Sequence, residues 1–77
     1  MTTSDTPSRE NLRCLVVEDQ TMFLQLLSGM LRTIPGVEVV ATATTVAEGQ
    51  AACDTEAVDL LILDLSLPDG NGLEVLR

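Results

Sequence analysis

Lysine, histidine, tryptophan and tyrosine are all absent from this sequence of 77 residues, and each absence excludes a kind of chemistry. Without histidine there is no imidazole base, no histidine metal ligand and no Ser/His or Cys/His dyad. Without lysine there is no Schiff-base chemistry and no ammonium group of the kind that a phosphate-binding loop uses. The groups left for chemistry are carboxylic acids, hydroxyls, two thiols and the backbone.

Positive charge is also scarce, because four arginines stand against twelve acidic residues and the net charge is −8. Binding to the phosphates of a nucleic acid or of an anionic membrane needs clustered positive charge, so we expect neither partner. No apolar run approaches the roughly 18 residues of a membrane span, and no signal-peptide pattern is present. We therefore expect a cytoplasmic protein.

Cysteine is limited to Cys14 and Cys53, which do not have CxxC spacing. Two cysteines do not make a disulfide framework, so we expect buried, reduced thiols. Leu, Ile, Val and Phe are abundant at 24 of the 77 residues, well above the roughly 20% below which disorder is typical. Because the first residues are polar, we expect a disordered leader over residues 1–11 and a partial domain over residues 12–77.

Strand-like and helix-like patterns alternate along the domain. Leu12–Val17 is a short apolar run that stops at an acidic pair, which is typical of a strand buried on both faces of a parallel sheet. From residue 20 to about residue 33, apolar residues recur at helical spacing until Pro35 and Gly36 end the pattern. We expect the apolar stripe of this helix to be core and not a cofactor site, and it consists of Met22, Phe23, Leu26, Leu27, Met30 and Leu31.

A second strand and a second helix follow. Val37–Ala41 is apolar and β-branched, which predicts the strand. Thr45 and Glu48 have capping-box spacing, in which the threonine hydroxyl accepts from an N–H three residues on and the glutamate reaches back. This predicts a helix that runs from Thr45 to about Cys53.

The third strand has the clearest pattern, because Asp59–Asp64 places four aliphatic residues between two aspartates and predicts a central strand. Turn residues fill positions 68–72, and Leu73–Leu76 predicts the start of a third helix. The fold class is therefore α/β, with a doubly wound parallel sheet in the order 2-1-3. It comprises β-α-β-α-β plus the start of a third helix.

Three carboxylic acids follow neighbouring strands, namely Glu18, Asp19 and Asp64. Because the carboxyl ends of parallel strands meet at one edge of a sheet, these side chains should converge. Like charges at close range repel, raise each other's pKa and favour a cation between them. Oxygen ligands without histidine or thiolate suit Mg²⁺, so the sequence predicts a magnesium site.

Two of these acids, Asp19 and Asp64, also have a purely structural interpretation. Asp19 precedes a helix and can be its N-cap, and Asp64 can be a polar residue that ends a strand. Asp69 and Gly70 are expected to form only a turn. The coincidence of Asp19 and Asp64 at adjacent strand ends favours the metal site.

These motifs resemble the receiver domain of bacterial two-component response regulators, a CheY-like domain, of which they match the amino-terminal portion. The resemblance lies in Leu15–Asp19 and Asp59–Gly72, with an acidic pair after the first strand and an aspartate after the third. A proline follows that aspartate by four residues and a glycine by eight. The resemblance implies a flavodoxin-like sheet and a phosphoacceptor module of a phosphorelay, which is not an enzyme.

The resemblance also implies a role for each residue of the site. Asp64 would accept the phosphoryl group from a phosphohistidine on a sensor histidine kinase or a phosphotransfer protein. Asp19 would bind Mg²⁺ directly and Glu18 would bind it through water. The backbone carbonyl of Ser66 would be a further ligand.

The sequence departs from the family pattern in what it leaves out. In the order 2-1-3-4-5, two further strands follow the third. By the resemblance, they carry a Ser/Thr, an aromatic switch residue and a lysine that pairs with the phosphoaspartate. This sequence holds no such segment, so we expect impaired phosphorylation. An unpaired third strand would also promote partial unfolding or self-association.

Two other functions compete with the phosphoacceptor. A pseudo-receiver fragment would not be phosphorylated and would associate through its exposed strand edge. An aspartate-dependent phosphatase would also place its nucleophile after an apolar strand. That chemistry needs a second acid two residues later, where this sequence has Ser66, so the phosphatase is disfavoured.

Overall fold

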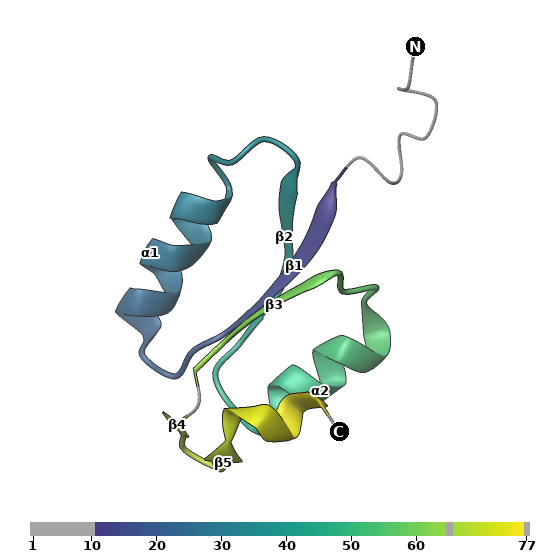
Figure 1. The fold of residues 1–77 in the computed structure, drawn as a ribbon. Helices are drawn as coiled ribbons and strands as arrows, with labels where there is room; N and C mark the ends of the chain where they lie inside the picture. Colours follow the sequence, from purple (N-terminus) through teal and green to yellow (C-terminus); the bar gives the residue numbers. More distant parts are fainter. Residues whose placement is uncertain (1–10, 65, 77) are drawn as a thin grey trace.

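A parallel sheet with helices on both faces forms the centre of the computed structural model, which describes residues 11–64 and 66–76 (Figure 1). The leader predicted over residues 1–11 therefore lies outside the described residues, except for residue 11. The main elements in chain order are β1 (Leu12–Val17), α1 (Thr21–Leu31), β2 (Val37–Ala43), α2 (Val46–Thr55) and β3 (Leu60–Leu63). After them come the short strands β4 (Ser66–Leu67) and β5 (Gly70–Asn71) and a 3₁₀ helix, η3 (Gly72–Leu76).

The sheet has the predicted order β2-β1-β3, with both pairs parallel. The central strand is β1, and its residues from Cys14 to Val17 are almost completely buried. Leu15 and Val17 face one side with Val46 and Val75, whereas Cys14 and Val16 face the other side with Leu24. The continuous apolar run of this strand is therefore explained by packing on both faces, and the predicted α/β fold class is confirmed.

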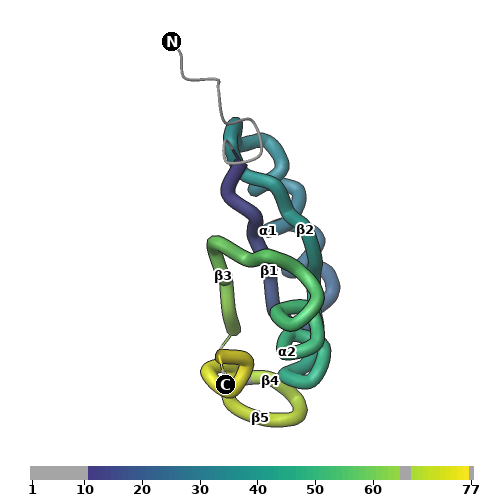
Figure 2. The backbone as a smooth tube through the Cα atoms, turned by 90° about the vertical axis from the view of Figure 1, so that its right-hand side faces the viewer, coloured from purple at the N-terminus to yellow at the C-terminus, as the bar shows by residue number. Residues whose placement is uncertain are grey.

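The prediction that the third strand is central was wrong for the part of the chain that the structure describes. There β3 pairs only with β1, and Figure 2 shows it at one margin of the sheet with β2 at the other. Leu60 is 37% exposed. Four aliphatic residues in a row report burial against a helix-covered sheet, but they do not report whether a strand has a neighbour on each side.

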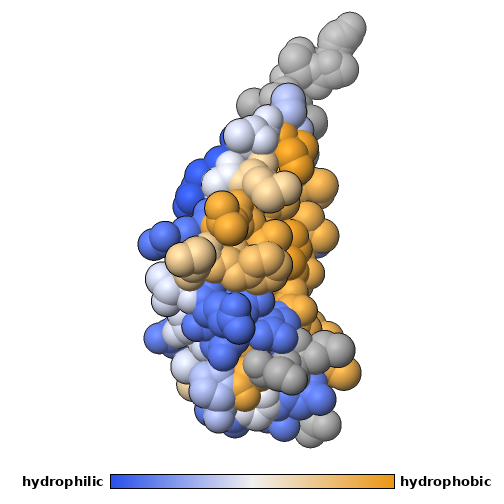
Figure 3. Space-filling view, turned by 90° about the vertical axis from the view of Figure 1, so that its left-hand side faces the viewer, coloured by the Kyte–Doolittle hydropathy of each residue, from blue (hydrophilic) through white to orange (hydrophobic). Residues whose placement is uncertain are grey.

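The prediction that the whole apolar stripe of the first helix is core was also wrong. Leu24 and Ser28 are the buried residues of α1, and Leu27 and Leu31 pack partly against the same face of the sheet. The other stripe residues are exposed, with Met22 at 76%. The stripe is wider than the line along which α1 touches β1 and β2, and Figure 3 shows hydrophobic side chains gathered on this side of the molecule. The exposed residues are Met22, Phe23, Leu26 and Met30.

The second helix begins where the sequence places it and shows a modified cap. The Thr45 hydroxyl accepts a hydrogen bond from the Glu48 N–H at 3.0 Å, as predicted. The Glu48 carboxylate reaches back to Thr44 and accepts from its N–H at 2.8 Å and from its hydroxyl at 2.9 Å, so it passes over Thr45. The helix continues to Thr55, and the preceding strand reaches Ala43, so each ends two residues later than expected.

Close packing joins α2 to η3 on one face of the sheet. A Cβ atom added to Gly49 would lie 3.0 Å from Val75 Cγ2 and 3.4 Å from Val17 Cγ2. The amide of Gln50 donates to the Glu74 carbonyl oxygen at 2.8 Å. The absence of a side chain at Gly49 therefore lets the two helices approach each other over the end of β1.

Both cysteines are free thiols, as predicted. Cys14 is buried in β1, and this burial raises the pKa of its thiol. Cys53 is only half-buried, so the prediction that both thiols are buried was wrong for this residue. Within residues 11–64 and 66–76, no helix combines the length and the apolar character that a membrane crossing requires.

Candidate metal centre

The register of the sheet brings the three predicted acids to one edge. Val17, the last residue of β1, is paired with Leu63, the last residue of β3. The Asp64 N–H donates to the Val17 carbonyl oxygen at 2.9 Å, and the Glu18 N–H donates to the Ala43 carbonyl oxygen at 3.0 Å. The backbones that carry Glu18 and Asp64 are thus tied to β1 and to its neighbours.

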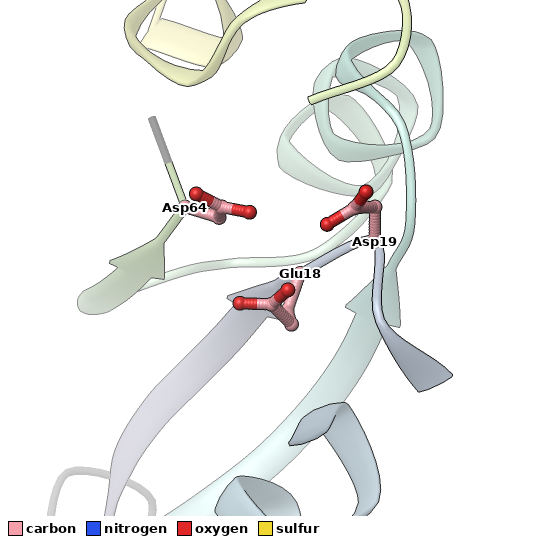
Figure 4. A group of neighbouring side chains, drawn as sticks. All are labelled: Glu18, Asp19 and Asp64. Atoms are coloured by element: carbon pink, nitrogen blue, oxygen red, sulfur yellow. The ribbon is translucent and has the colours of Figure 1, made fainter. Parts of the chain in front are cut away.

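The side chains of Glu18, Asp19 and Asp64 converge as the sequence predicts. One carboxylate oxygen from each lies within 4.8 Å of the other two. The carboxylates of Asp19 and Asp64 point toward each other, and Glu18 lies beside them at the end of β1 (Figure 4). Glu18 is only 8% exposed, Asp64 is half-buried and Asp19 is exposed, so the cluster is open to solvent on the Asp19 side.

The pKa of Glu18 reflects the neighbouring carboxylates. A hydrogen bond from the Gln20 N–H to Glu18 Oε2, at 3.1 Å, lowers the pKa of Glu18. Burial, a hydrogen bond with the Asp19 side chain and the charges of Asp64 and Asp19 raise it, and the net result is a raised pKa. A carboxylate that is harder to ionise than usual indicates a site that favours a cation or a proton.

The alternative role of Asp19 as a helix cap is not supported. The N-cap residue of α1 is Gln20, which makes no side-chain capping bond, and the first turn of the helix holds no acidic residue. Asp19 lies one residue before that cap and faces Asp64. The carboxylate of Asp19 therefore belongs to the acidic cluster.

The donor set fits Mg²⁺. All three groups offer oxygen, the ligand atom that this hard cation prefers, and Mg²⁺ commonly binds through one or two carboxylates and keeps several waters. Oxygen atoms on opposite sides of one Mg²⁺ lie about 4 Å apart. A spread of up to 4.8 Å between the carboxylates is therefore close to what one ion needs.

Ser66, the fourth predicted member of the site, begins β4, where it pairs with Asn71. Its backbone is described, whereas its side chain and the preceding residue lie outside the described part of the chain. The role of its carbonyl oxygen as a ligand stays a prediction.

Asp69 has a role beyond the turn that its sequence context predicts. Asp69 Oδ1 accepts from the Val46 N–H at 2.7 Å, and Oδ2 accepts from the Ala47 N–H at 3.1 Å. These bonds lower the pKa of Asp69, the Val46 bond most. Asp69 therefore caps α2 from more than twenty residues away, and the local pattern Pro-Asp-Gly carries no signal for that distant partner.

A family model and several known proteins match most of this chain. The family model described as "Response regulator receiver domain" matches residues 14–77. A protein-glutamate methylesterase/protein-glutamine glutaminase of Desulfotalea psychrophila is 40% identical over 71 residues, which cover 88% of this chain and 19% of that protein. The DNA-binding transcriptional activator DevR/DosR of Mycobacterium tuberculosis is 35% identical over 66 residues, which cover 86% of this chain and 30% of that protein.

A solved structure shows the same fold. The crystal structure of the response regulator domain of Thermotoga maritima CheB matches with a TM-score of 0.81 at 27% identity. The match covers 86% of this chain and 49% of that one. The chain thus spans about half of a solved receiver and less than a third of the two relatives described above, whose other parts have no counterpart in it.

Proposed function

This chain belongs to the response regulator receiver domain family, and from that premise we propose that Asp64 accepts a phosphoryl group in the presence of Mg²⁺. A receiver is a module of two-component signalling and implies a histidine kinase as partner. The donor proposed here is a phosphohistidine on a sensor kinase or on a phosphotransfer protein, in the cytoplasm.

The observation that supports this proposal most is the convergence of three carboxylates from the ends of adjacent strands. Glu18 and Asp19 would hold Mg²⁺, with the Ser66 carbonyl as a further ligand. When bound, the ion would supply positive charge against the charge of the transferred phosphoryl group. No other acidic, cysteine or histidine cluster of this kind is found in the described residues.

The residues of the chain contribute mainly position. A carboxylate oxygen of Asp64 would attack phosphorus and form a P–O bond while the P–N bond to the donor histidine breaks. The electron pair of the broken bond stays on the imidazole nitrogen, which takes up a proton. The hydrogen bond from the Asp64 N–H to Val17 fixes the backbone of the nucleophile on the central strand.

We expect the reaction to be slow in the chain as given. By the family resemblance, a lysine pairs with the phosphoaspartate, and the sequence contains no lysine. The negative charge of the acyl phosphate would therefore lack that ammonium partner and would depend on Mg²⁺.

Incubation of the chain with acetyl phosphate and Mg²⁺, followed by intact-mass measurement, tests the proposal. We expect a small fraction of protein with one added phosphoryl group, and none with Asp64→Asn. Asp54→Asn is the matched control, because Asp54 is exposed on α2 and lies outside the acidic cluster. Equal labelling of wild type and Asp64→Asn, or no labelling of wild type, would contradict the proposal.

A second candidate function rests on the exposed edge of β3. In the described part of the chain this strand pairs on one side only, and such an edge can pair with a second chain. A pseudo-receiver that associates through this edge would self-associate without being phosphorylated. Size-exclusion chromatography with light scattering tests this, and a stable monomer at all concentrations would count against it.

A further inference from the structure

We infer that Asp69 is a positioning residue for the metal site, because it anchors the hairpin that follows Asp64 to the first turn of α2. The inference rests on the proposed function, since it concerns the Mg²⁺ ligands named above. Asp69 is not itself a ligand in this proposal. It acts through the hairpin formed by β4 and β5.

The anchoring contacts are specific. The two oxygens of the Asp69 carboxylate accept separate hydrogen bonds from the first two N–H groups of α2, those of Val46 and Ala47. These N–H groups have no partner within a helix, so they are strong sites for a carboxylate. The Thr45 hydroxyl accepts a hydrogen bond from the Glu48 N–H, which is a separate contact at the same end of the helix.

The hairpin is held between this anchor and the core. Ser66 pairs with Asn71 and Leu67 pairs with Gly70, and Asp69 lies in the turn between them. Leu67 is buried in the cluster that includes Val46. The hydrogen bonds that Asp69 accepts from the helix and the packing of Leu67 therefore fix the hairpin relative to α2 at two points.

The hairpin connects Asp69 to the proposed metal site. Ser66, whose carbonyl oxygen is the proposed fourth ligand, is the first residue of the anchored hairpin. Asp64 lies only two residues before it in the chain. Loss of the anchor would leave Leu67, and the packing of η3 on α2 beyond the hairpin, to hold it, and would loosen the position of the Ser66 carbonyl at the other end. Groups that orient metal ligands typically change metal affinity when they are removed.

The test compares three variants by Mg²⁺ affinity, measured directly by isothermal titration. We expect Asp69→Ala to weaken Mg²⁺ binding by about tenfold. Asp69→Asn should recover part of the loss, because its side-chain oxygen can still accept one of the two bonds. Thr45→Ala is the matched control: it removes a cap from the same helix end without touching the hairpin, so it should leave Mg²⁺ affinity within about twofold.

A second measurement separates positioning from folding. Amide hydrogen exchange at Val46 and Ala47 should speed up in Asp69→Ala, and exchange at residues of β1 should stay slow, which shows that the sheet is intact. If Asp69→Ala does not fold, the Mg²⁺ affinity of Asp69→Asn is compared with that of Thr45→Ala instead, provided that the two variants have the same melting temperature. Equal Mg²⁺ affinity of these two variants, or of wild type and folded Asp69→Ala, would overturn the inference.

The outcomes also distinguish this inference from the proposed function. A wild-type chain that binds Mg²⁺ and an Asp69→Ala chain that binds it equally well would overturn the positioning role alone. A wild-type chain that binds no Mg²⁺ would overturn the metal site and, with it, this inference.

Discussion

At the scale of single residues, Glu18 and Asp69 are carboxylates in opposite electrostatic situations. Glu18 lies among other acids, and its pKa is raised. Asp69 accepts two backbone N–H groups, most strongly that of Val46, and its pKa is lowered. Glu18 therefore ionises more readily in the unfolded chain, whereas Asp69 ionises more readily in the folded chain.

Asp69 gives the folded state an acid-sensitive contribution. Its pKa in the folded chain lies below the ordinary value of 3.8. The stabilisation is therefore complete above that value and is lost as the pH falls through it toward the folded pKa. We expect the melting temperature of wild type to fall below about pH 4 more steeply than that of Asp69→Asn.

Thermal melts followed by circular dichroism between pH 3 and pH 6 check this prediction. Glu18 titrates in both proteins, so its opposite contribution cancels in the comparison. Parallel melting curves against pH for wild type and Asp69→Asn would contradict the assignment of the acid-sensitive contribution to Asp69.

At the scale of elements, helix α1 shows how far the sequence could predict the structure. Helical spacing placed the helix correctly and identified the residues of its apolar stripe. It could not indicate that contact with the sheet runs along Leu24 and Ser28 and leaves Met22 and Met30 exposed. Periodicity reports which residues share a face, whereas the facing elements decide which part of that face is buried.

The buried line of α1 can be tested by substitution. Leu24 lies against β1 residues Cys14 and Val16, so Leu24→Ala should lower the free energy of unfolding by about 2–4 kcal/mol. Met22→Ala, at an exposed position of the same helix, should change it by less than about 0.5 kcal/mol. Urea unfolding measures both values, and equal losses would show that the whole stripe is core.

The acidic cluster was predictable for a different reason. Parallel strands in the order 2-1-3 bring the ends of the first and third strands together regardless of the details of packing. Glu18, Asp19 and Asp64 therefore followed from topology alone. The cap by Asp69 did not, because a turn residue can bond to any N–H that the folded chain brings near it, and local sequence does not record which.

At the scale of the whole molecule, net charge and the metal site are linked. The chain carries a charge of −8, and three of its acids lie in the cluster. An ion that binds only the folded state stabilises it by mass action. At a Mg²⁺ concentration tenfold above the dissociation constant, we expect about 1.4 kcal/mol of added stability and a melting temperature higher by about 5–10 °C.

Differential scanning calorimetry with MgCl₂ and with NaCl at matched ionic strength separates binding from screening. The Mg²⁺-specific rise should be absent in the double variant Asp19→Asn with Asp64→Asn, because two of the three carboxylates of the cluster are then neutral. An equal rise in the two salts, or an undiminished rise in the double variant, would show that the cluster does not bind the ion.

The position of Cys14 gives the molecule a built-in reporter of its own opening. This thiol is fully buried in a strand that has a paired neighbour on each side. Because its side chain packs with Leu24 beneath α1, a thiol reagent can reach it only when α1 lifts from the sheet or the sheet opens, whereas Cys53 on α2 is partly accessible at all times. The ratio of the two alkylation rates therefore measures how often the α1-covered face of the central strand is uncovered, in a protein that has no tryptophan or tyrosine to report it by fluorescence.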